Sequence, residues 1–246
     1  MSLRFLTAGE SHGPALTAIL EGIPAGLSLS AADINHELTR RQQGYGAGPR
    51  MKLEQDQAQL LSGVRGGVAP GAPMAVLLQN RDRPKWRDRQ VPAMTAPRPG
   101  HVDLAGAIKY GYKDFRPAFK RASARETAAR VALGAICKRF LAECGVQIGG
   151  YVASIGEVSA KFDEIPLLER VSLAEQNEVR CPDAAAAQRM QQRIRQVMQD
   201  KDTLGGVVEV FAIGVPPGLG SHIQWDTPLE TRLGAAMLSV QAIKAV

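Results

Sequence analysis

Short apolar runs, several of them alternating with polar positions and most of them bounded by Gly or Pro, recur along the chain and predict β-strands. The runs cover residues 3–8, 15–21, 57–61, 73–79, 146–155, 205–213 and 239–246. Helical patterns are fewer, and strands follow one another in pairs rather than alternating with helices. We therefore expect an α+β fold with mainly antiparallel sheets.

A longer apolar stripe has the 3–4 spacing of a helix and predicts the longest helix, over 123–144. Its positions are Ala128, Val131, Ala132, Ala135, Ile136 and Phe140. Ser123 and Glu126 form a capping-box pattern at its start, in which the Ser123 hydroxyl accepts from the Glu126 amide and the Glu126 carboxylate accepts from the Ser123 amide. Other helices are expected near 30–40, 103–111, 183–200 and 227–238.

The chain of 246 residues is 45% hydrophobic, which suffices for one large domain or two small ones. Its net charge is +6, and the excess of Lys and Arg is concentrated in residues 36–52, 81–98 and 113–130. These clusters could be solvated surface, or could bind nucleic acid or an acidic small molecule. Only 5% of the residues are aromatic and no zinc-finger or RNP-type signature is present, which argues against nucleic acid.

One basic cluster crowds the start of the expected long helix, where Lys120, Arg121 and Arg125 meet the positive end of the helix dipole. A helix start also offers unpaired amides, so an anion among these cations would remove the electrostatic cost. The pattern predicts an anion site. The alternative is an ordinary capped helix with solvated arginines.

Three cysteines without CxxC spacing, no apolar leader and no apolar stretch of membrane length predict a soluble cytoplasmic protein without membrane contact. His and Cys residues lack metal-ligand spacing, so we expect no metal. Walker-type, dinucleotide-binding and Gly-x-Ser-x-Gly motifs are also absent from the sequence.

Two of the four histidines lie in glycine-containing turns at the ends of expected elements. His12 follows the first strand, and His101 follows Gly100. A single histidine is usually a surface or structural residue. Two in such turns, in a chain with three basic clusters, predict a pair of general acids.

Seven motifs, spread over the whole chain, carry a resemblance to a known family. They are Gly9-Glu10-Ser11-His12-Gly13, Arg98-Pro99-Gly100-His101-Val102-Asp103, Lys109-Tyr110-Gly111, Arg121-Ala122-Ser123-Ala124-Arg125-Glu126-Thr127-Ala128, Asp202-Thr203-Leu204-Gly205-Gly206, Pro217-Gly218-Leu219-Gly220-Ser221 and Ser239-Val240-Gln241-Ala242. In this order they resemble chorismate synthase.

The resemblance implies a single domain over residues 1–246 with a β-sandwich-like core surrounded by helices, assembled as a homotetramer. It implies a lyase of the shikimate pathway that converts 5-enolpyruvylshikimate 3-phosphate to chorismate and phosphate by 1,4-anti elimination, serving aromatic amino-acid biosynthesis. The family requires reduced FMN although the reaction has no net redox change. Either NADPH or an outside reductant would supply the electrons to the flavin.

The same resemblance assigns site residues. His12 corresponds to the histidine that protonates the departing phosphate, and His101 to the one that protonates reduced flavin near N1. Arg41 corresponds to an arginine assigned to NADPH that lies near the substrate phosphate. The implied FMN contacts are Arg121, Ala122, Ser123, Gln241 and Ala242.

Two departures from the family pattern are visible. Where relatives read Gly-Tyr-Gly-Arg-Gly-Arg-Arg-Met, this chain has Ala47 in place of the second phosphate-binding arginine and Pro49 in place of another. A lost charged donor costs about 1.5–3 kcal/mol, and either Arg50 or Lys52 would have to compensate for it. We assign phosphate binding to Arg41 and Arg50.

The chain also ends inside an apolar segment, as if cut through a strand. The resemblance implies that the family's C-terminal segment, with further FMN contacts and an Arg-Ser-Asp motif, is missing. The alternative function is therefore an inactive fragment that retains FMN or partner binding.

Overall fold

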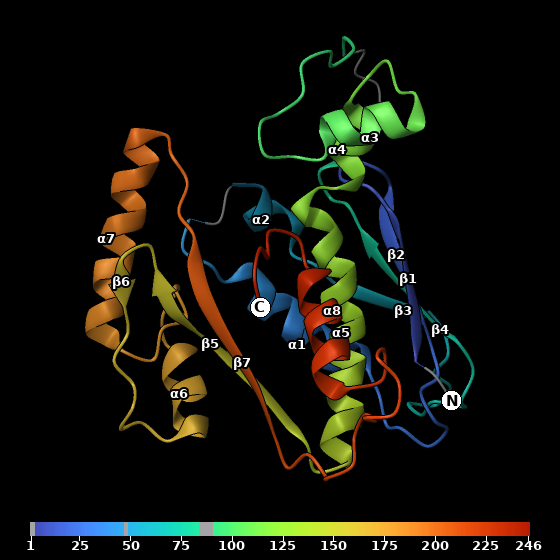
Figure 1. The fold of residues 1–246 in the computed structure, drawn as a ribbon. Helices are drawn as coiled ribbons and strands as arrows, with labels where there is room; N and C mark the ends of the chain where they lie inside the picture. The colour runs from blue at the N-terminus through green and yellow to red at the C-terminus, as the bar shows by residue number, and fades with distance from the viewer. Residues whose placement is uncertain (1–2, 47–48, 84–90) are drawn as a thin grey trace. The chain divides into compact units, whose positions relative to one another are not determined.

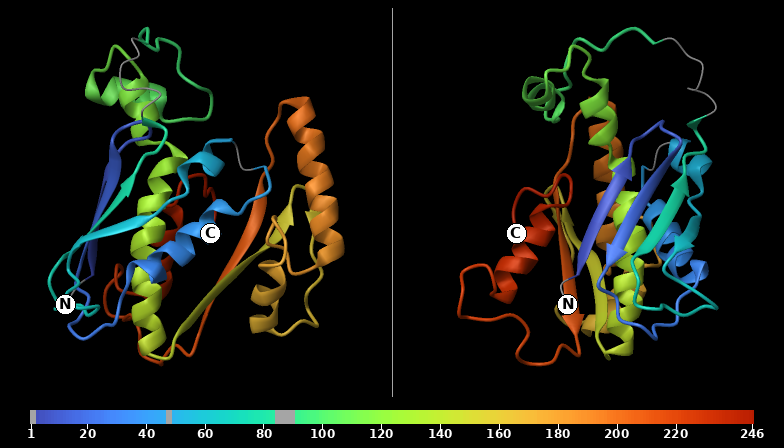
Figure 2. Two further views of the ribbon diagram at one scale, coloured as in Figure 1. Left: turned by 180° about the vertical axis from the view of Figure 1, so that it is seen from behind. Right: turned by 90° about the vertical axis from the view of Figure 1, so that its right-hand side faces the viewer.

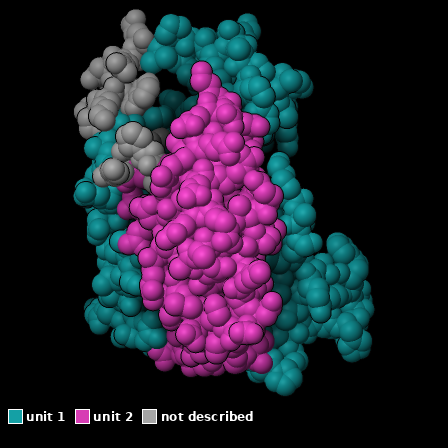
Figure 3. Space-filling view, turned by 90° about the vertical axis from the view of Figure 1, so that its left-hand side faces the viewer, with its two compact units in different colours: residues 1–41, 53–140, 216–246 teal, residues 42–52, 141–215 magenta. Residues whose placement is uncertain are grey.

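The structure is a computed structural model that describes residues 3–46, 49–83 and 91–246 (Figure 1). The chain divides into two compact units, shown in different colours in Figure 3. Unit 1 consists of Met1–Arg41, Leu53–Phe140 and Pro216–Val246, and unit 2 of Gln42–Lys52 and Leu141–Val215. The single domain expected over 1–246 stays a prediction.

Unit 1 is built on a four-stranded antiparallel sheet with the order β1-β2-β4-β3. The strands are β1 (Arg4–Gly9), β2 (Ala15–Glu21), β3 (Ala58–Ser62) and β4 (Met74–Gln79). In the central pair, Leu16 lies opposite Leu78 and Leu20 opposite Met74. Because alternate residues of a strand point to opposite faces, this register places the apolar residues of both strands on one face.

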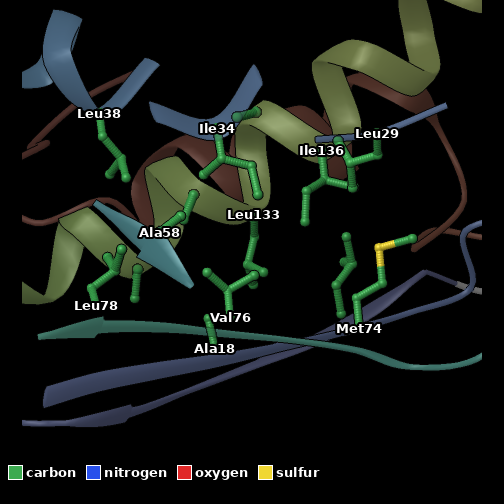
Figure 4. Close-up of a cluster of buried hydrophobic side chains, with 14 of the residues drawn as sticks. Ala18, Leu29, Ile34, Leu38, Ala58, Met74, Val76, Leu78, Leu133 and Ile136 are labelled. Atoms are coloured by element: carbon green, nitrogen blue, oxygen red, sulfur yellow. The ribbon is translucent and has the colours of Figure 1, made fainter. Parts of the chain in front are cut away.

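Two helices cover that face, α1 (Ala31–Gln42) and α5 (Thr127–Glu143), whose last three residues belong to unit 2. Figure 4 shows their side chains directed at those of the sheet, with Ile34 and Leu38 of α1 and Ile136 of α5 above Val76. The buried face of α5 is rich in alanine, which allows a helix to approach a sheet closely. Its buried residues are Ala128, Ala129, Ala132, Leu133, Ala135 and Ile136.

The remaining elements of unit 1 lead into and away from α5. Two short helices, α3 (Asp103–Tyr110) and α4 (Arg116–Arg121), pack on each other, and the 3₁₀ turn η2 (Ala124–Glu126) joins α4 to α5. The last helix, α8 (Leu229–Leu238; red in Figure 2), is followed by Ser239, which contacts α5.

Unit 2 contains a three-stranded antiparallel sheet with the order β6-β5-β7. Its strands are β5 (Gln147–Ile155), β6 (Val158–Ser159) and β7 (Gly206–Ile213), and its helices are α6 (Leu167–Ala174) and α7 (Ala184–Asp200). The helix predicted near 183–200 is confirmed as α7, and it begins after Asp183, an N-cap that accepts from the Ala186 amide at 3.0 Å. Met190 and Ile194 of α7 pack in the core of this unit.

The helix α2 (Pro49–Glu54) follows the glycine-rich segment. Its residues up to Lys52 belong to unit 2, and Leu53 and Glu54 belong to unit 1. Tyr45, just before it, belongs to unit 2: its amide donates to the carbonyl of Glu178 at 3.0 Å, and its hydroxyl bonds to Arg195 of α7. Unit 2 also has a shallow groove of about 430 Å³ between α7 and β7, lined largely by aliphatic side chains and by Gly205 and Gly206.

The predicted fold class is confirmed, since helices are mixed with antiparallel sheets. The strand expected at 239–246 is wrong: this segment consists of turns, with the Val240 amide bonded to the carbonyl of Met237 and the Ile243 amide to that of Val240. Ala242 has a φ of +70°, which is incompatible with a strand. Most of the segment is exposed, so its apolar run indicates neither a strand nor burial in this structure.

Candidate active site

The turn between β1 and β2 carries His12 in a left-handed conformation, with φ of +67°. Gly9 opens the turn with φ of +95°, and a Cβ there would lie 2.4 Å from the Ala15 carbonyl oxygen, so only glycine fits. Asn80, just after β4, donates its side-chain amide to the carbonyls of Glu10 and Gly13, both at 3.0 Å. The backbone that carries His12 is therefore fixed from two sides.

The imidazole of His12 is also fixed. Its Nδ1 lies 3.1 Å from Oδ2 of Asp82, and the two side chains are 16% and 10% exposed. An ionised carboxylate only accepts, so Nδ1 carries the proton of this hydrogen bond. This pairing defines the orientation of the ring.

Ser11 connects the His12 turn to α4. Its amide donates to the Lys120 carbonyl at 3.1 Å, which places the turn beside the C-terminal end of that helix. The Ser11 side chain is buried, and its Oγ has no hydrogen-bond partner among the described residues. A buried hydroxyl without a partner calls for an explanation, and a bound polar group or water is one.

The predicted FMN-binding segment comes next in the chain. Arg121 is half-exposed and donates through one nitrogen to both the carbonyl and the hydroxyl of Thr7 at 3.0 Å. Ala122 is the residue after α4, and Ser123 is the N-cap of η2. The segment therefore lies against β1, at the same end of unit 1 as His12.

The two hydrogen bonds predicted for a capping box between Ser123 and Glu126 are not the ones that these side chains form. Ser123 Oγ accepts from the Arg125 amide at 3.3 Å, because the chain enters α5 through a 3₁₀ turn. The Glu126 carboxylate turns away from the Ser123 amide and accepts from the Thr7 hydroxyl at 2.7 Å. The tertiary contact with β1 and the i,i+4 pair with Arg130 thus override the local cap.

We expect Ser123→Ala to lower the free energy of unfolding by about 1 kcal/mol, the usual cost of losing an N-cap acceptor. Urea titration followed by circular dichroism measures it. Ser159→Ala, at an exposed position on β6, is the control and should leave stability unchanged. Equal stability of both variants would show that the cap contributes nothing.

Arg125 points into the unit rather than toward an anion site. Its side chain is 4% exposed, and it pairs with Asp56 and, at 3.6 Å, with Glu54. It also donates from Nε to Oδ1 of Asn80 at 2.8 Å, and so supports the residue that fixes the His12 turn. The sequence predicted a cation at the helix start but not that this one is buried.

Arg41 joins the same network. It lies 3.6 Å from Oδ2 of Asp56 and donates to the Ala124 carbonyl at 2.9 Å and to the Thr127 hydroxyl at 3.1 Å. Burial lowers the pKa of its guanidinium, while the Asp56 charge acts in the opposite direction. Arg41 thus lies at the start of α5, where the predicted FMN segment ends.

The second predicted FMN segment, Gln241 and Ala242, follows the end of α8. Gln241 is half-buried and Ala242 is exposed. Arg130 of α5 donates to the carbonyl of Ser239 at 3.0 Å and to its hydroxyl at 2.9 Å. Both predicted FMN segments are therefore attached to the first two turns of α5.

His101 is exposed and lies just before α3. The buried Asp103 beside it accepts from Arg98 Nε at 2.8 Å, and the Arg98 guanidinium lies 3.7 Å above the ring of Phe119 in α4. Hydrogen bonds from Arg98 hold the pKa of Asp103 below its ordinary value, and His101 acts in the same direction. The Arg98–Asp103 pair beside His101 thus contacts α4, and no hydrogen bond joins His101 to His12 among the described residues.

The remaining predictions concern the segment that follows Arg41. The side chain of Arg50 and the whole of Ala47 lie outside the described residues.

Sequence reasoning missed Asn80 and Asp82; their position directly after a strand was the available signal. Within the described ranges, no His, Cys, Asp and Glu side chains group to hold a metal ion, and no helix is long and apolar enough to cross a bilayer.

Comparison with known proteins agrees with these motifs. The family model described as chorismate synthase matches residues 3–246. The chain belongs to the chorismate synthase family. It is 52% identical to the chorismate synthase of Aquifex aeolicus over 99% of this chain and 66% of that protein, and 50% identical to that of Desulforudis audaxviator over 99% and 65%.

A crystal structure of chorismate synthase superposes with a TM-score of 0.85 at 47% identity, covering 100% of this chain and 68% of that one. The chain thus spans about 65% of the length of the curated chorismate synthases that it matches. The fold is that of the family over the whole chain.

Proposed function

We propose that this chain is a lyase that converts 5-enolpyruvylshikimate 3-phosphate to chorismate and phosphate by 1,4-anti elimination, in aromatic amino-acid biosynthesis. The observation that carries the proposal is the gathering of the His12 turn and both FMN-type segments at one end of unit 1, in a chain of this family. Sequence identity near 50% over the whole chain supports it.

The residues at this end fit a flavin phosphate. Arg121 keeps about half of its side chain exposed two residues before the Ser123 cap. The Ser11 amide bonds to the Lys120 carbonyl, and the Ser11 hydroxyl has no partner among the described residues. Cations, amides and a hydroxyl are the groups that bind phosphate. We infer that Arg121, Ala122 and Ser123, with Gln241 and Ala242, hold reduced FMN.

Reduced FMN, when bound, would supply an electron to the substrate and take it back, which leaves no net redox change. NADPH is the reductant proposed for the flavin, with Arg41 and Arg50 near its phosphate or that of the substrate. Arg41 would have to share its guanidinium with Asp56 in that role.

The elimination breaks the bond between the substrate ring and phosphate and removes one ring proton. His12 would give a proton to an oxygen of the departing phosphate, which makes it a better leaving group. Asp82 holds the ring through Nδ1, so the other ring nitrogen is the one oriented for transfer. His101 would hold a proton beside the flavin ring.

Localisation and assembly follow from the same family expectation. We propose a cytoplasmic homotetramer that acts on a small phosphorylated substrate.

An anaerobic assay tests the function. The chain, chemically reduced FMN and 5-enolpyruvylshikimate 3-phosphate should give chorismate and phosphate in equal amounts. Neither product should form when FMN is omitted. FMN binding without any chorismate would instead favour the inactive fragment. Absence of both would remove the proposal.

A further inference from the structure

We propose that Arg130 is a positioning residue for the flavin site, which holds the segment Ser239–Ala242 in place relative to Arg121–Ser123. The inference rests on the proposed function, because it concerns the same two FMN segments. They lie more than a hundred residues apart in the sequence. A chain of hydrogen bonds through Arg130 connects them.

The first link joins α5 to the end of α8. One guanidinium nitrogen of Arg130 donates to both the carbonyl and the hydroxyl of Ser239, at 3.0 and 2.9 Å. Ser239 is the residue after α8, and its amide bonds to the Ala235 carbonyl. Arg130 therefore fixes the point from which Gln241 and Ala242 depart.

The second link orients Arg130 itself. Its Nε lies 3.3 Å from Oε1 and 3.2 Å from Oε2 of Glu126, one helical turn earlier. The Glu126 side chain is 6% exposed, so this pair lies in a setting that water screens poorly. Such a pair restricts the rotamers of both side chains.

The third link reaches the other FMN segment. Oε1 of Glu126 accepts from the Thr7 hydroxyl at 2.7 Å and lies 3.9 Å from Arg121. Arg121 in turn donates to Thr7 at 3.0 Å. A single carboxylate thus orients Arg121 of the first segment and Arg130 of α5, which binds the second segment at Ser239, with β1 as the common support.

The consequence is a cofactor site whose two halves are pre-positioned by one ion-pair network. A ligand that contacts both segments binds more tightly when neither has to be ordered on binding. Arg130 itself is 30% exposed and donates inward to protein groups. Its effect on FMN would therefore act through Ser239.

The test compares Arg130→Ala and Arg130→Lys with the wild-type chain. The control is Arg232→Ala, an exposed arginine on α8 itself. FMN affinity is measured by flavin fluorescence, and hydrogen–deuterium exchange at residues 239–243 is measured without ligand. Both are recorded well below the unfolding temperature of each variant.

We expect Arg130→Ala to weaken FMN binding about tenfold and to speed exchange at 239–243, because two hydrogen bonds to Ser239 are lost. Arg130→Lys should recover part of the affinity, since an ammonium can still bond one of these groups. Arg232→Ala should change neither quantity.

Faster exchange with unchanged FMN affinity would overturn the inference, because the segment would then be ordered for stability alone. Unchanged exchange would overturn it as well. A wild-type chain that binds no FMN would overturn the proposed function and this inference with it, whereas wild-type binding that Arg130→Ala leaves intact contradicts the inference only.

Discussion

His12→Asn is expected to lower chorismate formation by about 10²–10⁴-fold, the contribution usual for a positioned general acid. Asparagine suits this position because it tolerates the left-handed backbone that His12 adopts, with φ of +67°. Its side-chain amide can also donate to Asp82 in place of Nδ1. The variant should therefore fold and bind FMN, yet lack a proton to give to phosphate. Steady-state rates under anaerobic conditions measure the loss.

A matched control is His36→Asn, whose imidazole is 72% exposed on α1. It should keep the wild-type rate. If His12→Asn retains turnover within a few-fold of wild type, His12 is not the acid. If it loses FMN binding in proportion to its rate, the residue serves binding rather than proton transfer.

Arg125→Ala is expected to lower the free energy of unfolding by about 3–5 kcal/mol. The substitution removes one member of a buried cluster and leaves Glu54 and Asp56, both nearly inaccessible to solvent, with less positive charge to pair with. Asn80 loses a donor at the same time, so the His12 turn should loosen. Urea unfolding followed by circular dichroism provides the measurement.

Arg4→Ala is the control, because the Arg4–Glu21 pair lies on the surface at 4.0 Å with side chains 76% and 57% exposed. An exposed pair contributes about 0–1 kcal/mol. Comparable losses in the two variants would contradict the distinction between a structural and a surface arginine. An Arg125→Ala chain as stable as the wild type would mean that Glu54 and Asp56 form other ion pairs.

The sequence predicted the sheets well where apolar residues alternate or fill a short run between turns, as in β2 and β4, because both strands bury one face. It missed α4, although Pro117 in its first turn is a helix-start signal, because the helix has only six residues and no apolar stripe. It also placed a strand at 239–246, where the backbone instead turns after α8 and the apolar side chains are largely exposed.

The candidate site, like the fold, could be predicted from the sequence only in part. His12, Ser123 and Gln241 could be named from short motifs, since each lies in a local pattern of fixed spacing. The long-range contacts of the site could not be predicted: His12 and Asp82 are 70 positions apart, and Thr7 and Glu126 are 119 positions apart. Such contacts follow from strand order and register, which local spacing does not determine.

Arg125 is a second example of what local sequence patterns do not determine. A cation at a helix start predicts an anion, and the anions present are two carboxylates of the chain itself, Glu54 and Asp56. Arg121, four residues earlier, keeps an exposed guanidinium and remains the candidate for a ligand phosphate. Burial thus separates the structural role of Arg125 from the ligand-binding role proposed for Arg121.

A crystal structure of the chain with FMN and 5-enolpyruvylshikimate 3-phosphate tests most directly whether one end of unit 1 forms the site. The account predicts that the FMN phosphate contacts Arg121–Ser123 and Gln241–Ala242, and that the His12 imidazole faces the substrate phosphate. Both ligands bound elsewhere, for example in the groove beside α7, with His12 away from any phosphate, would contradict it.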